Sequence, residues 1–235
     1  MKIYGKNVAL EKLNSNKKIN KIYLSKNFSD NKILSLIKQK NIKIETLENK
    51  DLDKMCKGLH QGIILDVEDI KTYDLDDTIQ NIKKEYPLIV ILDHIEDPHN
   101  FGAIIRSCEA FGADAIIIPN DRSVNITSTV VKVSVGTIDK VKIVKVVNIS
   151  QAIKKLKEYG YWIVGTDMEG INYTDIDYKT KIAIVIGNEG KGISRLVSEK
   201  CDYIAKIPME GEVNSLNASV ACGVFMSEIN RSRRN

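Results

Sequence analysis

The feature that most constrains the fold is a series of continuous apolar runs in the second part of the chain. Beginning at Pro87, short runs rich in Val and Ile alternate with segments whose apolar residues recur at helical spacing. Strands without a polar face must be covered on both sides, and their alternation with helices is typical of a parallel sheet. We therefore expect an α/β fold with a parallel sheet between two helical layers. The expected strands are 88–93, 115–120, 142–146, 161–167 and 181–189, and the expected helices are 102–111, 127–135, 149–159, 194–199 and 218–229.

The residues before this pattern form a second, smaller unit. Short helical and strand-like segments alternate over residues 1–68, including a helix that ends at Gln39 and has Ser29 or Asp30 as its N-cap. Residues 69–86 are acidic and weakly apolar, apart from a helical pattern at 75–83. The sequence thus predicts a small N-terminal α/β domain at 1–68, a linker or docking helix at 69–86 and the larger domain at 87–235.

Positive charge is concentrated in the first domain. Residues 1–60 carry 14 Lys and no Arg against 6 Asp and Glu, a net charge of +8, whereas the whole chain carries +4. Lysines are compact charges that suit phosphates, so this segment is suited to a polyanion. A well-solvated lysine-rich surface is the other explanation.

Several classes of protein are disfavoured by what the sequence lacks. The longest apolar runs are five residues, Leu88–Leu92 and Ile182–Ile186, whereas a membrane helix needs about 20. The N-terminus is charged and has no secretory pattern, so we expect a cytoplasmic protein without membrane contact. The 4 cysteines and 3 histidines form no close ligand pairs, which argues against a metal site.

Ligands of parallel sheets bind beyond the carboxyl ends of strands, and three such ends have unusual polar or glycine content. The first follows Leu92, where a polar loop leads into a helix expected near Gly102. Asn100 is placed to cap that helix, and Arg106 follows six residues later. Such an arginine can hold a phosphate through two hydrogen bonds, although a solvated or salt-bridged arginine is the commoner case.

The second strand end has the pattern G-x-x-G-x-G at Gly187, Gly190 and Gly192, where backbone amides can approach a ligand closely. It does not match the P-loop, because no Ser or Thr follows Lys191, nor the dinucleotide pattern, because Arg195 takes the last glycine's place. A tight strand-to-helix turn would explain the same glycines.

The third strand end lies between residues 205 and 229. A short strand ends at 206–208, residues 211–214 form a turn, and Ser215-Leu216-Asn217 precedes a helix rich in small residues. Ser215 or Asn217 is suited to cap that helix.

These three stretches, in this order, resemble the SpoU (TrmH-type) branch of the SPOUT RNA 2′-O-ribose methyltransferases. That family transfers a methyl group from S-adenosyl-L-methionine to a ribose hydroxyl. The resemblance covers residues 87–235 and includes TSTVVKVSVGTIDKVKIVKV at 127–146. GKNVALEKL near the start and LHQGI at 59–63 are similar to the ribosomal-protein-like substrate domain of one subgroup, whose members methylate a guanosine of 23S rRNA.

The resemblance implies a deep trefoil knot in the C-terminal SPOUT domain, a homodimer, and the cofactor S-adenosyl-L-methionine held by the second and third loops. RNA, and 23S rRNA in particular, is the implied partner, whereas DNA is not. Carried onto this chain, the cofactor-binding positions are Thr166, Gly187, Ile207 and Leu216, with Asn188, Met209 and Ser219 as neighbours. The active-site positions are Asn100, Arg106, Glu189, Ser215 and Asn217.

The chemistry sets roles for these positions, because a ribose hydroxyl must lose its proton as it attacks the methyl group. Arg106 corresponds to the family's proposed proton acceptor, but a guanidinium stays protonated. We expect Arg106 to hold an RNA phosphate and to stabilise the developing oxyanion, which leaves the proton acceptor open. Asn100 and Asn217 would orient the ribose and Arg106, and Glu189 would hold the loops or bind the substrate.

Three other functions are compared with the residues of this sequence. A non-catalytic RNA-binding protein is expected to lose Arg106, Glu189 or Asn217, and all three are present. A nucleotide-dependent oxidoreductase would have its glycine loop after the first strand rather than a late one. A transfer-RNA guanosine 2′-O-methyltransferase of the same family stays open, although such enzymes usually lack this front domain. The C-terminal arginines 231, 233 and 234 either contact phosphate or form a disordered end.

Overall fold

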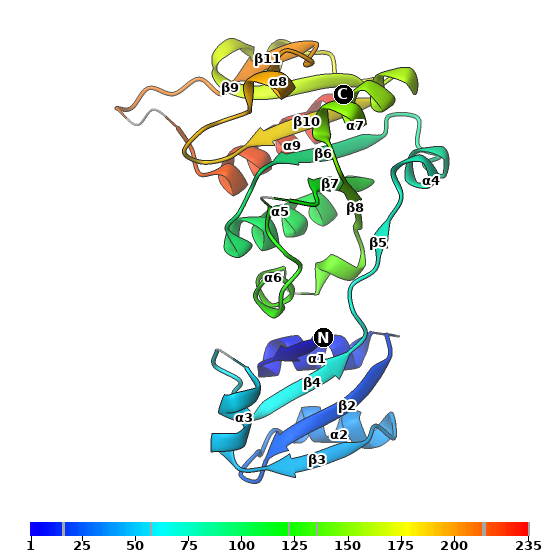
Figure 1. Cartoon of the computed structure of the whole chain (residues 1–235), viewed down its shortest axis with the longest axis vertical. Helices are drawn as coiled ribbons and strands as arrows, with labels where there is room; N and C mark the ends of the chain where they lie inside the picture. Colours follow the sequence, from blue (N-terminus) through cyan, green and yellow to red (C-terminus); the bar gives the residue numbers. More distant parts are fainter. Residues whose placement is uncertain (16, 57, 122, 135, 213–214, 235) are drawn as a thin grey trace.

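The computed structural model describes residues 1–235 except 16, 57, 122, 135, 213–214 and 235. Figure 1 shows a small unit formed by the N-terminal residues and a larger unit stacked above it. The elements of the small unit are β1 (Lys2–Tyr4), α1 (Lys6–Asn14), β2 (Ile19–Ser25), α2 (Asn31–Gln39), β3 (Ile44–Leu47), α3 (Asn49–Met55) and β4 (Ile63–Val67). Its four strands form one sheet in the order β1-β4-β2-β3.

Helix α2 shows how the local sequence builds the small unit. Asp30 is its N-cap, and the Asp30 carboxylate accepts a hydrogen bond from the backbone N–H of Ile33 at 3.1 Å. Ile33 and Ile37, one turn apart, are buried against the sheet. The predicted helix and the predicted capping by Asp30 are therefore confirmed.

The larger unit is built on a seven-stranded sheet in which the described strand pairs are parallel, as predicted. Its elements are β5 (Thr72–Tyr73), α4 (Leu75–Gln80), β6 (Leu88–Asp93), α5 (Pro98–Ala110), β7 (Ala115–Pro119), α6 (Ser128–Val133), η1 (Thr137–Asp139), β8 (Lys142–Val146), α7 (Ile149–Glu158), β9 (Trp162–Asn172), η2 (Tyr173–Asp175), β10 (Ile182–Gly187), α8 (Arg195–Ser198), β11 (Tyr203–Lys206) and α9 (Ala218–Arg234). The strands lie in the order β11-β9-β10-β6-β7-β8-β5.

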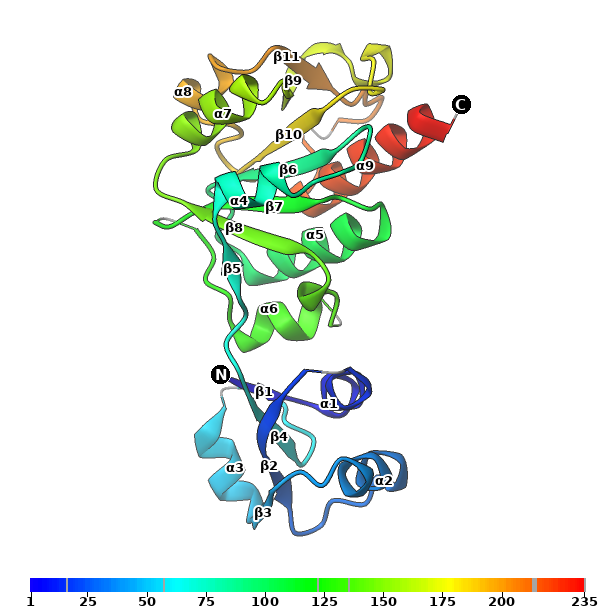
Figure 2. The same ribbon diagram turned by 90° about the vertical axis from the view of Figure 1, so that its right-hand side faces the viewer.

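Helices cover both faces of this sheet, which explains its continuous apolar strands. Along β6, Leu88, Val90 and Leu92 belong to the core shared with α5 and α9. The alternate residues Ile89 and Ile91 belong to the core shared with α4, α7 and α8. Figure 2 shows α5 and α9 on one side of the strands and α7 and α8 on the other. The α/β fold predicted from the apolar runs is confirmed.

Two segments differ from expectation. Residues 69–86, expected as a linker or docking helix, contain helix α4, which packs on the sheet inside the expected helical segment 75–83, but they also contribute strand β5, which pairs with β8 and was not expected. The C-terminal arginines lie within α9 and form no disordered end, because Arg233 donates hydrogen bonds to the carbonyl oxygens of Tyr178, Thr180 and Pro87. Part of the turn expected at 211–214 falls on residues 213–214, outside the described residues. Among the described residues, no helix has the length and apolar character needed to cross a bilayer.

The expected capping by Asn100 is wrong. Helix α5 starts at Pro98 rather than near Gly102, so Asn100 lies inside its first turn. Asp97 is the N-cap, and its carboxylate accepts a hydrogen bond from the His99 backbone N–H at 2.9 Å. Proline suits the first helical position, because its fixed φ matches the helix and its missing N–H would have had no helical partner.

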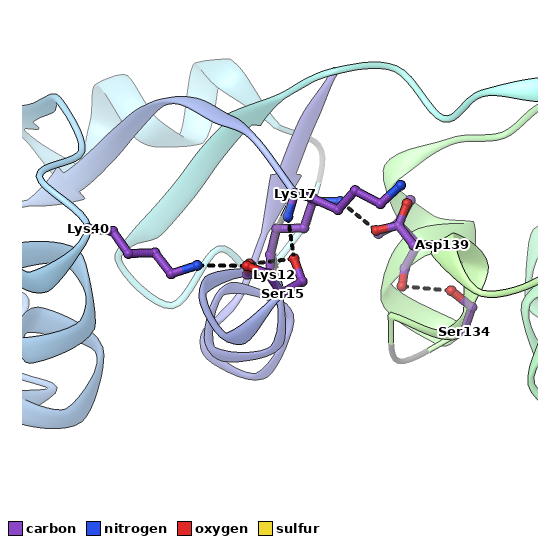
Figure 3. A network of polar contacts seen from close by, with 7 residues as sticks. Lys12, Ser15, Lys17, Lys40, Ser134 and Asp139 are labelled. Carbon is purple, nitrogen blue, oxygen red and sulfur yellow. Dashed lines mark hydrogen bonds and ion pairs between the residues drawn. The ribbon is translucent and has the colours of Figure 1, made fainter.

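The two units touch through α1 and β1 on one side and α6 and η1 on the other. The ion pair between the Lys12 ammonium and the Asp139 carboxylate spans this junction at 2.6 Å. Figure 3 shows Lys12 reaching from α1 to Asp139, with Lys17 and Lys40 nearby on the small unit.

Candidate functional site

A cavity of about 370 Å³ opens at the carboxyl end of β10 and beside the middle of β9, just after the pairing between these two parallel strands ends at Gly165. Three groups of residues make its walls: residues 166–168 of β9, the end of β10 with the glycine turn after it, and described residues from the segment between β11 and α9 and from α9 itself. The lining residues are Thr166, Asp167, Met168, Ile186, Gly187, Asn188, Glu189, Gly190, Lys191, Gly192, Ile207, Met209, Ser215, Leu216, Ala218, Ala221 and Phe225.

The glycine turn is closed on itself. Asn188 and Gly192 exchange two backbone hydrogen bonds, of 3.0 and 2.8 Å, and the Asn188 side-chain oxygen accepts another from the Gly190 N–H. Gly187 is packed so tightly that a β-carbon there would overlap the backbone of Gly192 and Ile193. Gly192 adopts a left-handed φ of 65°. The glycines thus allow a compact turn whose backbone faces the cavity.

Asp93 and His94, at the end of β6, hold both ends of this turn. The Asp93 carboxylate, which is 1% exposed, accepts a hydrogen bond from the Ser194 N–H at 2.6 Å. Its other oxygen lies 2.6 Å from the His94 ring Nδ1. The His94 carbonyl oxygen accepts a bond from the Asn188 side-chain amide at 3.0 Å, and His94 itself has a left-handed φ of 61°. Sequence reasoning missed this anchor, although an acidic residue at the end of a buried strand was a signal for it.

Asn100 and Asn217 join the N-terminal ends of α5 and α9. The Asn217 side-chain oxygen accepts hydrogen bonds from the backbone N–H of Ser219 and of Val220, so it caps α9 as the sequence suggested. Its amide nitrogen then donates to the Asn100 side-chain oxygen at 3.0 Å. Two helix N-termini therefore converge beside the cavity, and both favour negative charge.

Asp97 continues this arrangement at the start of α5. The backbone N–H of His99 holds the pKa of the Asp97 carboxyl below its usual value, and the Asn100 side-chain amide adds to the effect. A chain of polar contacts thus runs from Asp97 through Asn100 and Asn217 into α9.

The residues expected at the site divide into three groups. Thr166, Gly187, Ile207 and Leu216, expected at the cofactor, all line the cavity, as do the neighbours Asn188 and Met209. Of the expected active-site residues, Glu189 and Ser215 also line it, whereas Asn100 and Asn217 are bonded to each other. Ser219 does not line the cavity and donates to Asn217. Arg106 does not line it either and lies exposed further along α5.

Several lining residues were not foreseen. Asp167 and Met168 directly follow Thr166 in β9, so the strand end itself was the signal. Ala221 and Phe225 lie one and two turns after Ala218 on one face of α9, a spacing that could have revealed them. Among the described residues, no group of three His, Cys, Asp or Glu side chains is arranged to hold a metal ion.

Comparison with known proteins decides the family. Residues 87–227 match the model of the SpoU rRNA Methylase family, and residues 2–73 match the model described as RNA 2′-O ribose methyltransferase substrate binding. The chain belongs to the SpoU rRNA methylase family. The two matches fall on the two units of the structure, so both units of this SpoU family member have a recognised counterpart.

Individual relatives agree with this assignment. A Bacillus subtilis protein named as the TrmH family tRNA/rRNA methyltransferase YacO is 41% identical over 98% of this chain and 95% of its own length. The SpoU methyltransferase AviRb from Streptomyces viridochromogenes, solved in complex with AdoMet, has a TM-score of 0.81 and 23% identity over 100% of this chain and 90% of its own. A TrmH/SpoU tRNA modifying enzyme of A. aeolicus has a TM-score of 0.59 and 32% identity, and covers 68% of this chain and 84% of its own.

Proposed function

We propose that the protein methylates the ribose 2′-hydroxyl of a guanosine in 23S rRNA and takes the methyl group from S-adenosyl-L-methionine. The observation that carries the proposal is the cavity formed by β9, the glycine turn after β10 and the start of α9, beside the bonded pair Asn100–Asn217, in a chain of the SpoU family. The match of residues 2–73 to a substrate-binding model for RNA 2′-O ribose methyltransferases supports both the RNA and the ribose.

The residues present fit the methyl donor. The cavity volume, about 370 Å³, lies in the range of small-molecule sites, and Ile207, Leu216 and Phe225 give it apolar walls for an adenine. Gly187 and the closed turn after it bring backbone groups to the surface of the cavity. In the proposal, Thr166, Gly187, Ile207 and Leu216 hold the donor inside a trefoil knot. When bound, the donor supplies an electrophilic methyl group.

Asn100 and Asn217 have the geometry to orient the substrate. Because the Asn217 oxygen caps α9, its amide nitrogen must face Asn100, so the bond between the two side chains has one direction. The pair sits where two helix N-termini meet, and this positive field favours the oxyanion that forms as the hydroxyl loses its proton. Ser215 and Glu189, on the cavity wall, are within the same site and complete the proposed set.

Arg106 is proposed to hold an RNA phosphate outside the cavity. It lies six residues after Asn100 on α5, which is about 9 Å along a helix axis. Its side chain is exposed, so a phosphate of bound RNA can reach it while the ribose contacts the asparagine pair. The guanidinium then acts as a fixed positive charge, and another group or water accepts the proton.

We further propose a homodimer that acts in the cytoplasm. Val220 on α9 is 51% exposed, and the rings of Trp162 on β9 and Tyr203 on the edge strand β11, tilted at 36° with centroids 5.8 Å apart, are also exposed. Exposed apolar side chains of this kind suit contact with a second copy. Light scattering coupled to size-exclusion chromatography would test it; a monomer at micromolar concentration would refute this part of the proposal.

The direct test is methyl transfer to RNA. The protein is incubated with labelled S-adenosyl-L-methionine and total RNA from a strain that lacks its gene, and the modified position is mapped. We expect label in 23S rRNA, on the 2′-oxygen of a guanosine. Label found only in tRNA would show that tRNA, and not 23S rRNA, is the substrate. Label on a base would refute the proposed transfer to the ribose.

A further inference from the structure

The junction between the two units contains a carboxylate in an unusual position. Glu11, on α1 of the small unit, lies against Gly136 of the larger unit, where any β-carbon would overlap the Glu11 carboxylate. Gly136 has a left-handed φ of 68°, so it suits this place both by conformation and by its lack of a side chain. The Glu11 side chain of the small unit is therefore packed directly against the backbone of the larger unit.

This carboxylate is poorly satisfied. Its Oε2 atom is buried and has no hydrogen-bond partner within the described part of the chain. Burial raises the pKa of Glu11, and the charge of Asp139 adds to the rise, whereas Lys140, Arg106 and Lys12 oppose it. A carboxylate oxygen that is buried without a hydrogen-bond partner weakens the contact that buries it.

Two of the three cations around Glu11 pair with other acids of the chain. Lys12 pairs with Asp139 at 2.6 Å, with side chains only 10% and 19% exposed, and Lys140 pairs with Glu109 at 3.2 Å. These cations come from both units: Lys12 from α1, and Lys140 from the residue after η1. Figure 3 shows Lys40 on the side of α1 away from Asp139, where its Nζ donates a hydrogen bond to the Ser15 carbonyl oxygen at 2.6 Å.

We propose that this junction is a binding surface for the RNA backbone, and that Glu11 and Asp139 occupy it in place of phosphates until RNA parts the two units. The proposal rests on the proposed function, since it assumes an RNA substrate that reaches Arg106. A phosphate backbone pairs with lysines and arginines and releases counterions, so it can replace the carboxylates. Glu11 makes the closed junction easy to open, because separation returns its carboxylate to water.

The sign of the pH effect follows from the raised pKa of Glu11. The closed junction holds a proton on Glu11 more tightly than the open one does. Closure is therefore favoured at low pH and weakens as the pH rises from the ordinary value, 4.5, through the raised one. The groups that face Glu11 and set this response are Lys12 on α1, Arg106 on α5, and Asp139 and Lys140 at η1.

Energy transfer between dyes on the two units of the full chain measures the opening. Dyes are attached through Lys43→Cys and Lys154→Cys, both at exposed positions, after Cys56 and Cys201, the two cysteines that are not buried, are replaced by Ser. Total RNA from a strain lacking the gene is titrated at about pH 5 and about pH 8, and methyl transfer is measured on the same samples.

We expect RNA to lower the transfer efficiency, and the RNA-free protein to be more closed at about pH 5 than at about pH 8. Glu11→Gln should remove this pH response and raise the RNA concentration for half-opening several-fold. Asp139→Asn should open the junction without RNA. Glu48→Gln is the control, because it changes the same charge in the exposed pair with Lys26, within the small unit.

Each result bears on the proposal. A Glu11→Gln variant that keeps the wild-type pH response and RNA titration would overturn it, as would methyl transfer to RNA with no change in efficiency. Opening by RNA without any methyl transfer would support the junction and refute the proposed function instead.

Discussion

Replacing Gly187 by Ala tests whether the glycine turn forms the wall of the methyl-donor site. A β-carbon at Gly187 would lie 2.6 Å from the carbonyl oxygen of Gly192 and overlap further backbone atoms of Gly192 and Ile193. The two backbone bonds between Asn188 and Gly192 keep that oxygen in place, so it cannot rotate aside. The turn must then move by about 1 Å to restore an ordinary contact of ~3.5 Å.

The size of the effect follows from the strain. Forcing a carbon into packed atoms costs about 1–3 kcal/mol. If the turn moves away from the donor to relieve it, affinity for S-adenosyl-L-methionine falls roughly 5- to 150-fold. Isothermal titration calorimetry gives the affinity, and thermal unfolding shows whether the variant is still folded.

The same turn provides matched controls. At Gly190 the nearest atom to a β-carbon is the Asn188 side-chain oxygen at 3.8 Å, so Gly190→Ala should bind the donor as the wild type does. Gly192 has open space but a φ of +65°, so Gly192→Ala should lose about fivefold, from ~1 kcal/mol of backbone strain. Equal losses in all three variants, or wild-type binding by Gly187→Ala, would show that the glycine turn is not the wall of the donor site.

Three further predictions concern the helices around the site. Arg106→Ala should remove most methyl transfer and leave donor affinity nearly unchanged, because Arg106 lies outside the cavity. If binding and turnover assays showed equal losses of donor affinity and activity, the role of Arg106 would be structural. Asn217→Ala should destabilise the fold by ~1 kcal/mol through the lost α9 cap and also lower turnover, which denaturant unfolding and kinetics check together; a variant with unchanged stability would rule out the cap. The Asp97 carboxylate, whose pKa is lowered first by the His99 N–H, stabilises the fold above its ordinary pKa of 3.8 and loses this effect as the pH falls through the lowered value. Asp97→Asn should therefore be less stable at neutral pH and show a flatter decline in stability below about pH 4; parallel acid-unfolding curves would contradict this.

Local patterns allowed much of the fold to be predicted. The strands of the parallel sheet are visible because both of their faces are apolar, as Ile89 and Ile91 on one face of β6 and Val90 on the other show, and because polar loops bound each run. Strand β5 was not predictable, since its two residues, Thr72 and Tyr73, are ordered only by pairing with β8 some 70 residues later. The C-terminal end of α9 was not predictable for the same reason. It is held by hydrogen bonds that Arg233 donates to the carbonyl oxygens of Tyr178 and Pro87, which lie far away in the sequence.

At the site, the sequence indicated residue types better than their contacts. The glycine pattern and the Ser215–Asn217 stretch pointed to the correct strand ends because glycine and capping residues have local conformational roles. Asn100 was misplaced as a cap because Asp97 and Pro98 form an equally good helix start three residues earlier. The hydrogen bond from the Ser194 N–H to the Asp93 carboxylate joins residues 101 positions apart, so only the packed sheet brings them together.

The most direct measurement for the central claim is a crystal structure of the full chain with bound S-adenosyl-L-methionine. We expect the donor in the cavity of about 370 Å³, against Gly187, Ile207 and Leu216, with its methyl group toward the Asn100–Asn217 pair. A donor bound at any other place on the chain, with this cavity left open, would contradict this expectation.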